Sequence, residues 1–223
     1  SFFKDVCERF VKNKRAMIAL VIFLIIALMA IFGPMISPYS YDGMDTAIMN
    51  QRPSTAHWFG TDRFGRDLFT RVLYGARISL MVGIVTAVIN TIIGVIYGGI
   101  AGYVGGRVDM WMMRLTDILY SIPELLYIIL IMLIFGSNVR SIIIGVCVAG
   151  WISMARMVRS QIITLKEQEF ALAAFVLGAN SRRILFKHLI VNSLGTIIVT
   201  ITLMIPQAIF MEAFLSFVGV GIS

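Results

Sequence analysis

The feature that most constrains this chain is a stretch without any charged residue from Ala16 to Ile36. A helix needs about 20 apolar residues to cross the hydrocarbon core of a bilayer, whereas the apolar part of a secretory signal has only about 7–15. The stretch therefore predicts a membrane-spanning anchor helix that stays in the protein. Basic residues crowd the segment 1–15 before it, and this predicts that the N-terminus lies in the cytoplasm.

Four further apolar stretches, 78–103, 108–135, 141–158 and 189–218, predict four more spans. Hydrophobic residues make up 59% of the chain and charged residues 14%, against about 45–50% and about 25% in soluble domains. We therefore expect an all-α integral membrane protein, surrounded by lipid, with a polar outer loop at 37–77 after the anchor. Most of the 19 Lys and Arg residues then lie on the inner side. The net charge of +7 consequently indicates membrane orientation, not nucleic-acid binding.

Small residues crowd the second predicted span, and they let membrane helices approach closely. They are Gly83, Gly94, Gly98, Gly99 and Gly102.

The third predicted span, 108–135, is unusual because it carries charges. Arg114 and Asp117 are three residues apart, so they can pair along one helix face. Charges at membrane depth mark a bundle interior or a water-filled path. We therefore assign a translocation path to Asp117, Glu124 and, in the last span, Glu212. The alternative is that Asp109, Arg114 and Asp117 lie near the inner end and only pair with neighbours.

A charged segment, 166–192, separates the last two spans. Apolar residues recur at helical spacing over 170–177, and Gly178 and Asn180 interrupt the pattern as helix-stop signals. Ser181 can cap a second short helix over 182–186. The pattern predicts a short helix, a bend and another short helix at the inner membrane surface, presenting the small residues Ala173, Ala174 and Gly178.

This segment resembles the Glu-Ala-Ala loop of binding-protein-dependent ABC transporter permeases. Ala173 and Ala174 are followed after three residues by Gly178, while Leu172 stands where the family often has Glu and Val191 where Pro is usual. The resemblance implies a cytoplasmic coupling helix that contacts an ATPase subunit. The coupling residues it implies are Glu169, Phe170, Leu172, Ala173, Ala174, Gly178, Ala179, Arg182, Arg183 and His188.

The outer segment carries a second resemblance. His57 is followed by Gly60-Thr61-Asp62, Gly65-Arg66-Asp67 and, later, Gly75-Ala76-Arg77. This pattern, and the ending 215–221, resemble the C-type permease subunit of dipeptide and oligopeptide importers. The residues themselves predict that Gly60, Gly65 and Gly75 make turns and that Asp62, Arg66 and Asp67 pair locally.

The resemblance implies the fold of a type I ABC importer permease, with residues 78–223 as its transmembrane domain. The resemblance also implies a sixth helix beyond residue 223, and since the chain opens on Ser and closes just after a span, we expect it to be part of a longer protein. Implied partners are a second, B-type permease, two ABC ATPases that hydrolyse the ATP, and an extracellular peptide-binding protein. The implied location is the bacterial or archaeal cytoplasmic membrane, and the implied function is ATP-driven import of short peptides by alternating access.

A membrane enzyme is disfavoured, because His57 and His188 are predicted on opposite sides and no G-x-S-x-G, H-E-x-x-H or phosphate-binding loop occurs. Cys7 and Cys147 give no disulfide or metal pattern. We expect no catalytic, cofactor or metal site. A permease for nickel or another small solute remains open, as does a stand-alone secondary transporter or channel.

Overall fold

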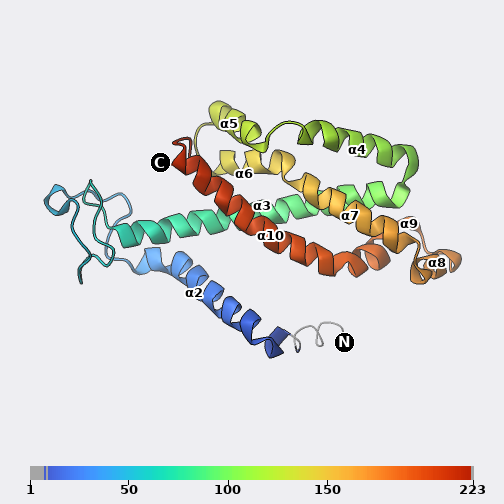
Figure 1. Cartoon of the computed structure of the whole chain (residues 1–223), viewed down its shortest axis with the longest axis horizontal. Helices are drawn as coiled ribbons and strands as arrows, with labels where there is room; N and C mark the ends of the chain where they lie inside the picture. The colour runs from blue at the N-terminus through green and yellow to red at the C-terminus, as the bar shows by residue number, and fades with distance from the viewer. Residues whose placement is uncertain (1–7, 9, 222–223) are drawn as a thin grey trace. The chain divides into compact units, whose positions relative to one another are not determined.

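The computed structural model describes residue 8 and residues 10–221, and within them it confirms an all-α fold without strands (Figure 1). Of the expected basic flank, Lys4 and Arg9 lie outside these residues, as does Cys7. The elements are α2 (Lys14–Ile36), η1 (Thr46–Ile48), α3 (Leu68–Val104), α4 (Gly106–Tyr120), α5 (Glu124–Phe135), α6 (Val139–Ala149), α7 (Trp151–Lys166), α8 (Glu169–Val176), α9 (Ser181–Arg183), η2 (Ile184–Leu189, a π-helical turn) and α10 (Ile190–Phe217).

Among the described residues, four helical stretches are long and apolar enough to cross a membrane. They are Lys14–Ile36, Leu68–Val104, Val139–Lys166 and Ser181–Phe217. The helices α4 and α5 make a fifth if they count as one span, but they are bent by 72° relative to each other. The third span expected over 108–135 is therefore broken near its middle, and it counts as a span only if the two helices are taken together. Pro123 stands at the break, and proline disfavours helix at the residue before it.

Two other expected boundaries also move. The second span does not begin at residue 78, because α3 already starts at Leu68, so Gly75 lies inside a helix and makes no turn. Asp67 explains this early start: its Oδ2 accepts hydrogen bonds from the Thr70 backbone N–H (2.7 Å) and hydroxyl (2.8 Å), as an N-terminal cap does. The fourth span likewise continues past Arg159 to Lys166.

The chain divides into two compact units between Leu80 and Met81. In the first unit, the segment between α2 and α3 is ordered by a turn around Asp62. The carboxylate of Asp62 accepts hydrogen bonds from the backbone N–H groups of Phe64 and Arg66 and pairs with the Arg66 guanidinium at 2.8 Å. Gly65 has a positive φ of 73°, and a Cβ there would lie 1.8 Å from the Asp45 carbonyl oxygen. The expected Asp–Arg pairing and glycine turn are confirmed here.

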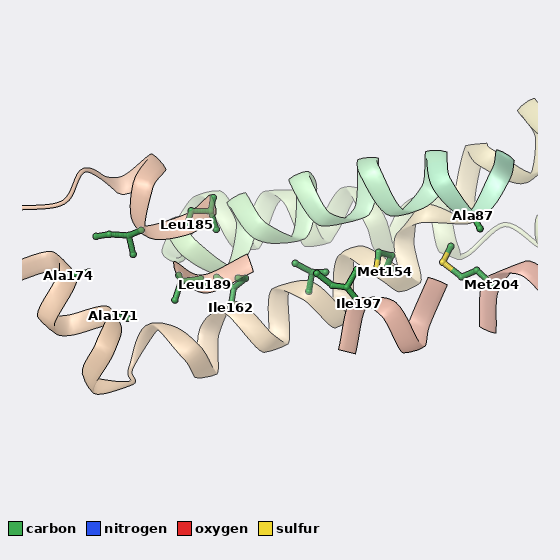
Figure 2. Packing of buried hydrophobic residues seen from close by; sticks show 11 residues of the cluster. Ala87, Met154, Ile162, Ala171, Ala174, Leu185, Leu189, Ile197 and Met204 are labelled. Atoms are coloured by element: carbon green, nitrogen blue, oxygen red, sulfur yellow. The ribbon is translucent and has the colours of Figure 1, made fainter. Parts of the chain in front are cut away.

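The second unit is held together by an apolar cluster that joins α3, α7, α8, η2 and α10 (Figure 2). Met154 and Ile162 of α7 and Leu189 of η2 are fully buried in it. The glycines of α3 allow this packing, because a Cβ at Gly98 would lie only 2.1 Å from the Ala155 carbonyl oxygen on α7. The expectation that small residues bring the second span close to a neighbour is confirmed.

Candidate functional site

The segment after α7 forms a helical hairpin whose first arm is α8. Ala171 and Ala174, one turn apart, are 3% and 9% exposed. They belong to the apolar cluster that also contains Leu185 and Leu189 of η2 (Figure 2). The short side chains of the two alanines are what let α8 lie close to α7 and η2.

The bend between the two arms is built on Gly178. Its φ is +78°, its N–H donates to the Phe175 carbonyl, and the Ala179 N–H donates to the Ala174 carbonyl, both at 3.0 Å. This double hydrogen bond is the Schellman ending of a helix, which favours glycine at the left-handed position. The expected stop at Gly178 is therefore confirmed.

The second arm differs from the expectation in two ways. Asn180, not Ser181, is the N-cap, because its side-chain oxygen accepts the Arg183 backbone N–H at 2.8 Å. The helix also does not end near residue 186. It runs through the π-helical turn η2 into α10, so Ser181–Phe217 is one continuous helical stretch. Since π-helical turns inside helices often mark functional sites, η2 belongs to the candidate site.

The surface that α8 presents is bulky and not small. Phe175, Val176 and Leu177 are 70%, 82% and 87% exposed, whereas Ala174 is buried. The expected knob of Ala173, Ala174 and Gly178 is therefore corrected: Ala174 packs inward, and three large apolar side chains face outward. We call Phe175–Leu177 the apolar tip.

The other residues assigned to coupling surround this tip. Glu169, Phe170, Leu172, Ala173, Arg182 and Arg183 are exposed, whereas Ala179 and His188 are half-buried. The structure thus gathers these residues in one hairpin, with His188 in η2. Phe170 and Leu172 add further exposed apolar surface, at 38% and 54%.

The charges of the broken third span pair with α7. Asp117 forms an ion pair with Arg156 at 2.8 Å, and Asp109 forms a bidentate one with Arg159. The predicted pairing of Asp117 with Arg114 is therefore wrong. The alternative, that these acids pair with neighbours, describes Asp109 and Asp117 correctly.

A cavity of about 840 Å³ lies in the second unit, and Glu124 is on its wall. The wall is formed by α3, the α4–α5 break, α6, α7 and α10, with Pro206 and Gln207 of α10 on it. Two other residues assigned to the path lie elsewhere. Asp117 is exposed beside Arg156, and Glu212 is buried and accepts a hydrogen bond from the Ser216 hydroxyl at 3.3 Å.

Sequence reasoning overlooked Asn90, which is 3% exposed on the cavity wall. Its Oδ1 has no hydrogen-bond partner among the described residues. The signal was present, since an amide in the middle of a long apolar helix is a costly choice that marks a function by default.

The segment between α2 and α3 contains a buried polar network. His57 Nδ1 and Asp67 Oδ1 are 2.9 Å apart, and both residues are about 5% exposed. Burial alone would raise the pKa of Asp67, but hydrogen bonds from Thr70 and His57 outweigh it and hold that pKa below its usual value. Asp67 therefore pairs with His57, not with an arginine as the local-pairing interpretation implied.

Comparison with known proteins agrees with this architecture. Residues 94–223 match the family described as binding-protein-dependent transport system inner membrane component, and residues 1–53 match the N-terminal TM domain of oligopeptide transport permease C. The oligopeptide transport system permease protein OppC of Bacillus subtilis is 50% identical over 100% of this chain and 73% of its own length. The dipeptide transport system permease protein DppC of the same species is 50% identical over 100% of this chain and 69% of its own length. OppC of Escherichia coli is 46% identical over 99% of this chain and 74% of its own length.

The helical fold and these matches define a multi-pass membrane permease with the type I ABC permease fold. The chain belongs to the family of binding-protein-dependent transport system inner membrane components. Members of this family work within multi-subunit ABC systems of the bacterial inner membrane.

Proposed function

We propose that this permease carries short peptides into the cell by alternating access, powered by two separate ABC ATPase subunits. The observation that carries the proposal is the match along the whole chain to permeases named for oligopeptide and dipeptide transport. The cavity supports it, because about 840 Å³ lies within the range of about 300–1,000 Å³ that small-molecule sites occupy. A B-type permease subunit would complete the path, and an extracellular binding protein would deliver the peptide.

In this proposal the apolar tip of α8 is the part that enters an ATPase subunit. Phe175, Val176 and Leu177 are three consecutive exposed apolar side chains, and apolar side chains that become buried as anchors supply most of the binding energy at interfaces. Arg182 and Arg183 lie exposed in the next helical turn, where they can meet acidic groups of a partner. The orientation that this requires places the N-terminus and α8 in the cytoplasm.

The structure also offers a route from the tip to the cavity. The inner face of α8 packs on η2, which is continuous with α10. Pro206 and Gln207 of α10 line the cavity. Movement of the ATPase subunits would therefore displace one wall of the cavity through a single helical stretch.

Leu177→Asp tests this role by changing the exposed side chain of the C-cap residue while Gly178 itself stays in place. A change at Gly178 is less informative, because any other L-residue at φ +78° disturbs the turn itself. Leu177→Asp should lower ATPase co-purification and peptide-driven ATP hydrolysis by about tenfold or more, as losses at interface anchors do. Leu177→Met, which keeps the apolar volume, is the matched control and should retain both.

Normal ATPase recovery and normal peptide uptake by Leu177→Asp would contradict the docking role. The transport function itself is tested in proteoliposomes with the wild-type transporter. Uptake of a labelled peptide should stop with vanadate, an ATPase inhibitor. Uptake that vanadate does not inhibit and that an ion gradient drives would instead indicate a secondary carrier.

A further inference from the structure

The cavity of the second unit combines an apolar wall with one charged side chain. Its wall is mainly apolar, and Glu124 is the one charged residue among the described residues that line it. Glu124 is the first residue of α5, directly after the break at Pro123. The broken helix pair thus places a single carboxylate against an apolar space.

Asn90 supplies a second, independent polar group on the same wall. Its side chain is almost completely buried, yet its Oδ1 accepts no hydrogen bond within the described part of the chain. Thr86, one turn away on α3, differs because its hydroxyl already donates to the Val82 carbonyl at 2.7 Å. Buried acceptors are rarely left unpaired, and Asn90 lines the cavity, so a donor from a ligand would satisfy its oxygen once the atoms that cover this oxygen move aside.

Close packing limits how far the Asn90 amide can turn away. A Cβ on Gly150 would lie 2.4 Å from Asn90 Nδ2, so the amide fits against α6 only because residue 150 is glycine. At one end of the apolar cluster, Ala87 and Met204 lie close together and form part of the same wall (Figure 2). The amide is therefore held on the cavity wall by its neighbours.

A ligand with one positively charged donor and a further N–H would satisfy both groups. We propose that this cavity binds the amino-terminal end of a peptide, with Glu124 facing the ammonium group and Asn90 Oδ1 accepting an N–H. The inference rests on the proposed peptide transport. The apolar remainder of the wall, which includes Met204 and Met211, suits side chains of varied shape, because methionine adapts to irregular surfaces.

The test is a thermodynamic cycle in the complete transporter, reconstituted with its partner permease, ATPases and binding protein. Uptake of trialanine is compared with uptake of propionyl-dialanine, in which hydrogen replaces the ammonium group. The preference is measured in wild type and in Glu124→Gln. Any preference of the binding protein for the free amine is the same with the wild-type permease and with Glu124→Gln, so it cancels in the ratio of the two measured preferences.

Glu124→Gln should reduce the preference for the free amine by about tenfold, because hydrogen bonds to charged groups are worth at least that factor. Asp42→Asn makes the same carboxyl-to-amide change at an exposed position of the outer segment and should leave the preference unchanged.

Asn90→Leu should lower uptake of both peptides several-fold, because each retains an amide N–H. The matched control is Thr91→Val on the same helix. Thr91 also has a buried unpartnered oxygen, but it does not line the cavity. Thr91→Val should transport normally.

An unchanged preference in Glu124→Gln, together with equal behaviour of Asn90→Leu and Thr91→Val, overturns the inference and leaves peptide transport standing. Absence of peptide uptake by the wild-type transporter refutes the proposed function instead. If Glu124→Gln transports neither peptide, a tripeptide with a photoreactive second side chain is irradiated on the wild-type transporter. Labelling within 120–124 or 204–211 supports the site, and labelling confined to other segments overturns it.

Discussion

Adding one methyl group to α3 at Gly98 should destabilise the second unit. The new Cβ would lie 2.1 Å from the carbonyl oxygen of Ala155, about 1.3 Å short of the 3.4 Å at which ordinary contact begins. The obstacle is backbone, which cannot rotate away as a side chain can. The helices α3 and α7 must therefore separate, and the buried contacts of Met154 beside this point loosen. We expect Gly98→Ala to lower the free energy of unfolding by about 2–3 kcal/mol, the upper part of the range for overpacked cores.

The neighbouring Gly99 provides the control. A Cβ there would meet only the ends of Ile190 and Leu185 side chains, at 3.6 Å, which is ordinary contact. The assay is thermal unfolding of the purified protein in detergent, followed by far-ultraviolet circular dichroism at one fixed scan rate. Gly98→Ala should lower Tm by roughly 5–10 °C, while Gly99→Ala should match wild type. Equal Tm values for the two variants would refute the argument that close contact of α3 and α7 fixes this part of the fold.

Three further predictions concern the charges and the orientation. The lowered pKa of Asp67 stabilises the segment between α2 and α3 above the unfolded-state pKa of about 3.9, and this contribution is lost as pH falls through the lower folded value. Proteolysis of this segment should therefore become faster in strong acid. At pH 7 it should become faster in Asp67→Asn but not in Asp42→Asn. Asp109→Asn should lower the free energy of unfolding by about 1–3 kcal/mol, and Asp117→Asn by less than about 1 kcal/mol, because the ion pair of Asp117 is more exposed. Equal decreases in Tm for the two variants would contradict this order. Thr55→Cys should react with a membrane-impermeant thiol reagent in intact cells, and reaction only after permeabilisation would invert the orientation and remove the docking role of α8.

Much of the candidate site could be found from sequence, but its outward face could not. The stop at Gly178 follows from local chemistry, since glycine accepts the positive φ that ends a helix. The apolar spacing over 170–177, however, does not mark the inner side of α8, because the sequence of this helix is apolar almost all round. Contact with η2 decides this, and it turns Ala171 and Ala174 inward.

The sequence by itself determined the class of protein and located four of the five expected spans, because the length of an apolar stretch is set by the bilayer and needs no knowledge of packing. It also determined the turn at Asp62, whose partner Arg66 is four residues away. Only the tertiary structure decided that Asp109 pairs with Arg159, 50 residues away, and that Asn90 shares a cavity with Glu124. Contacts of this kind depend on which helices lie side by side, and close packing of glycines and alanines along whole helices settles that arrangement.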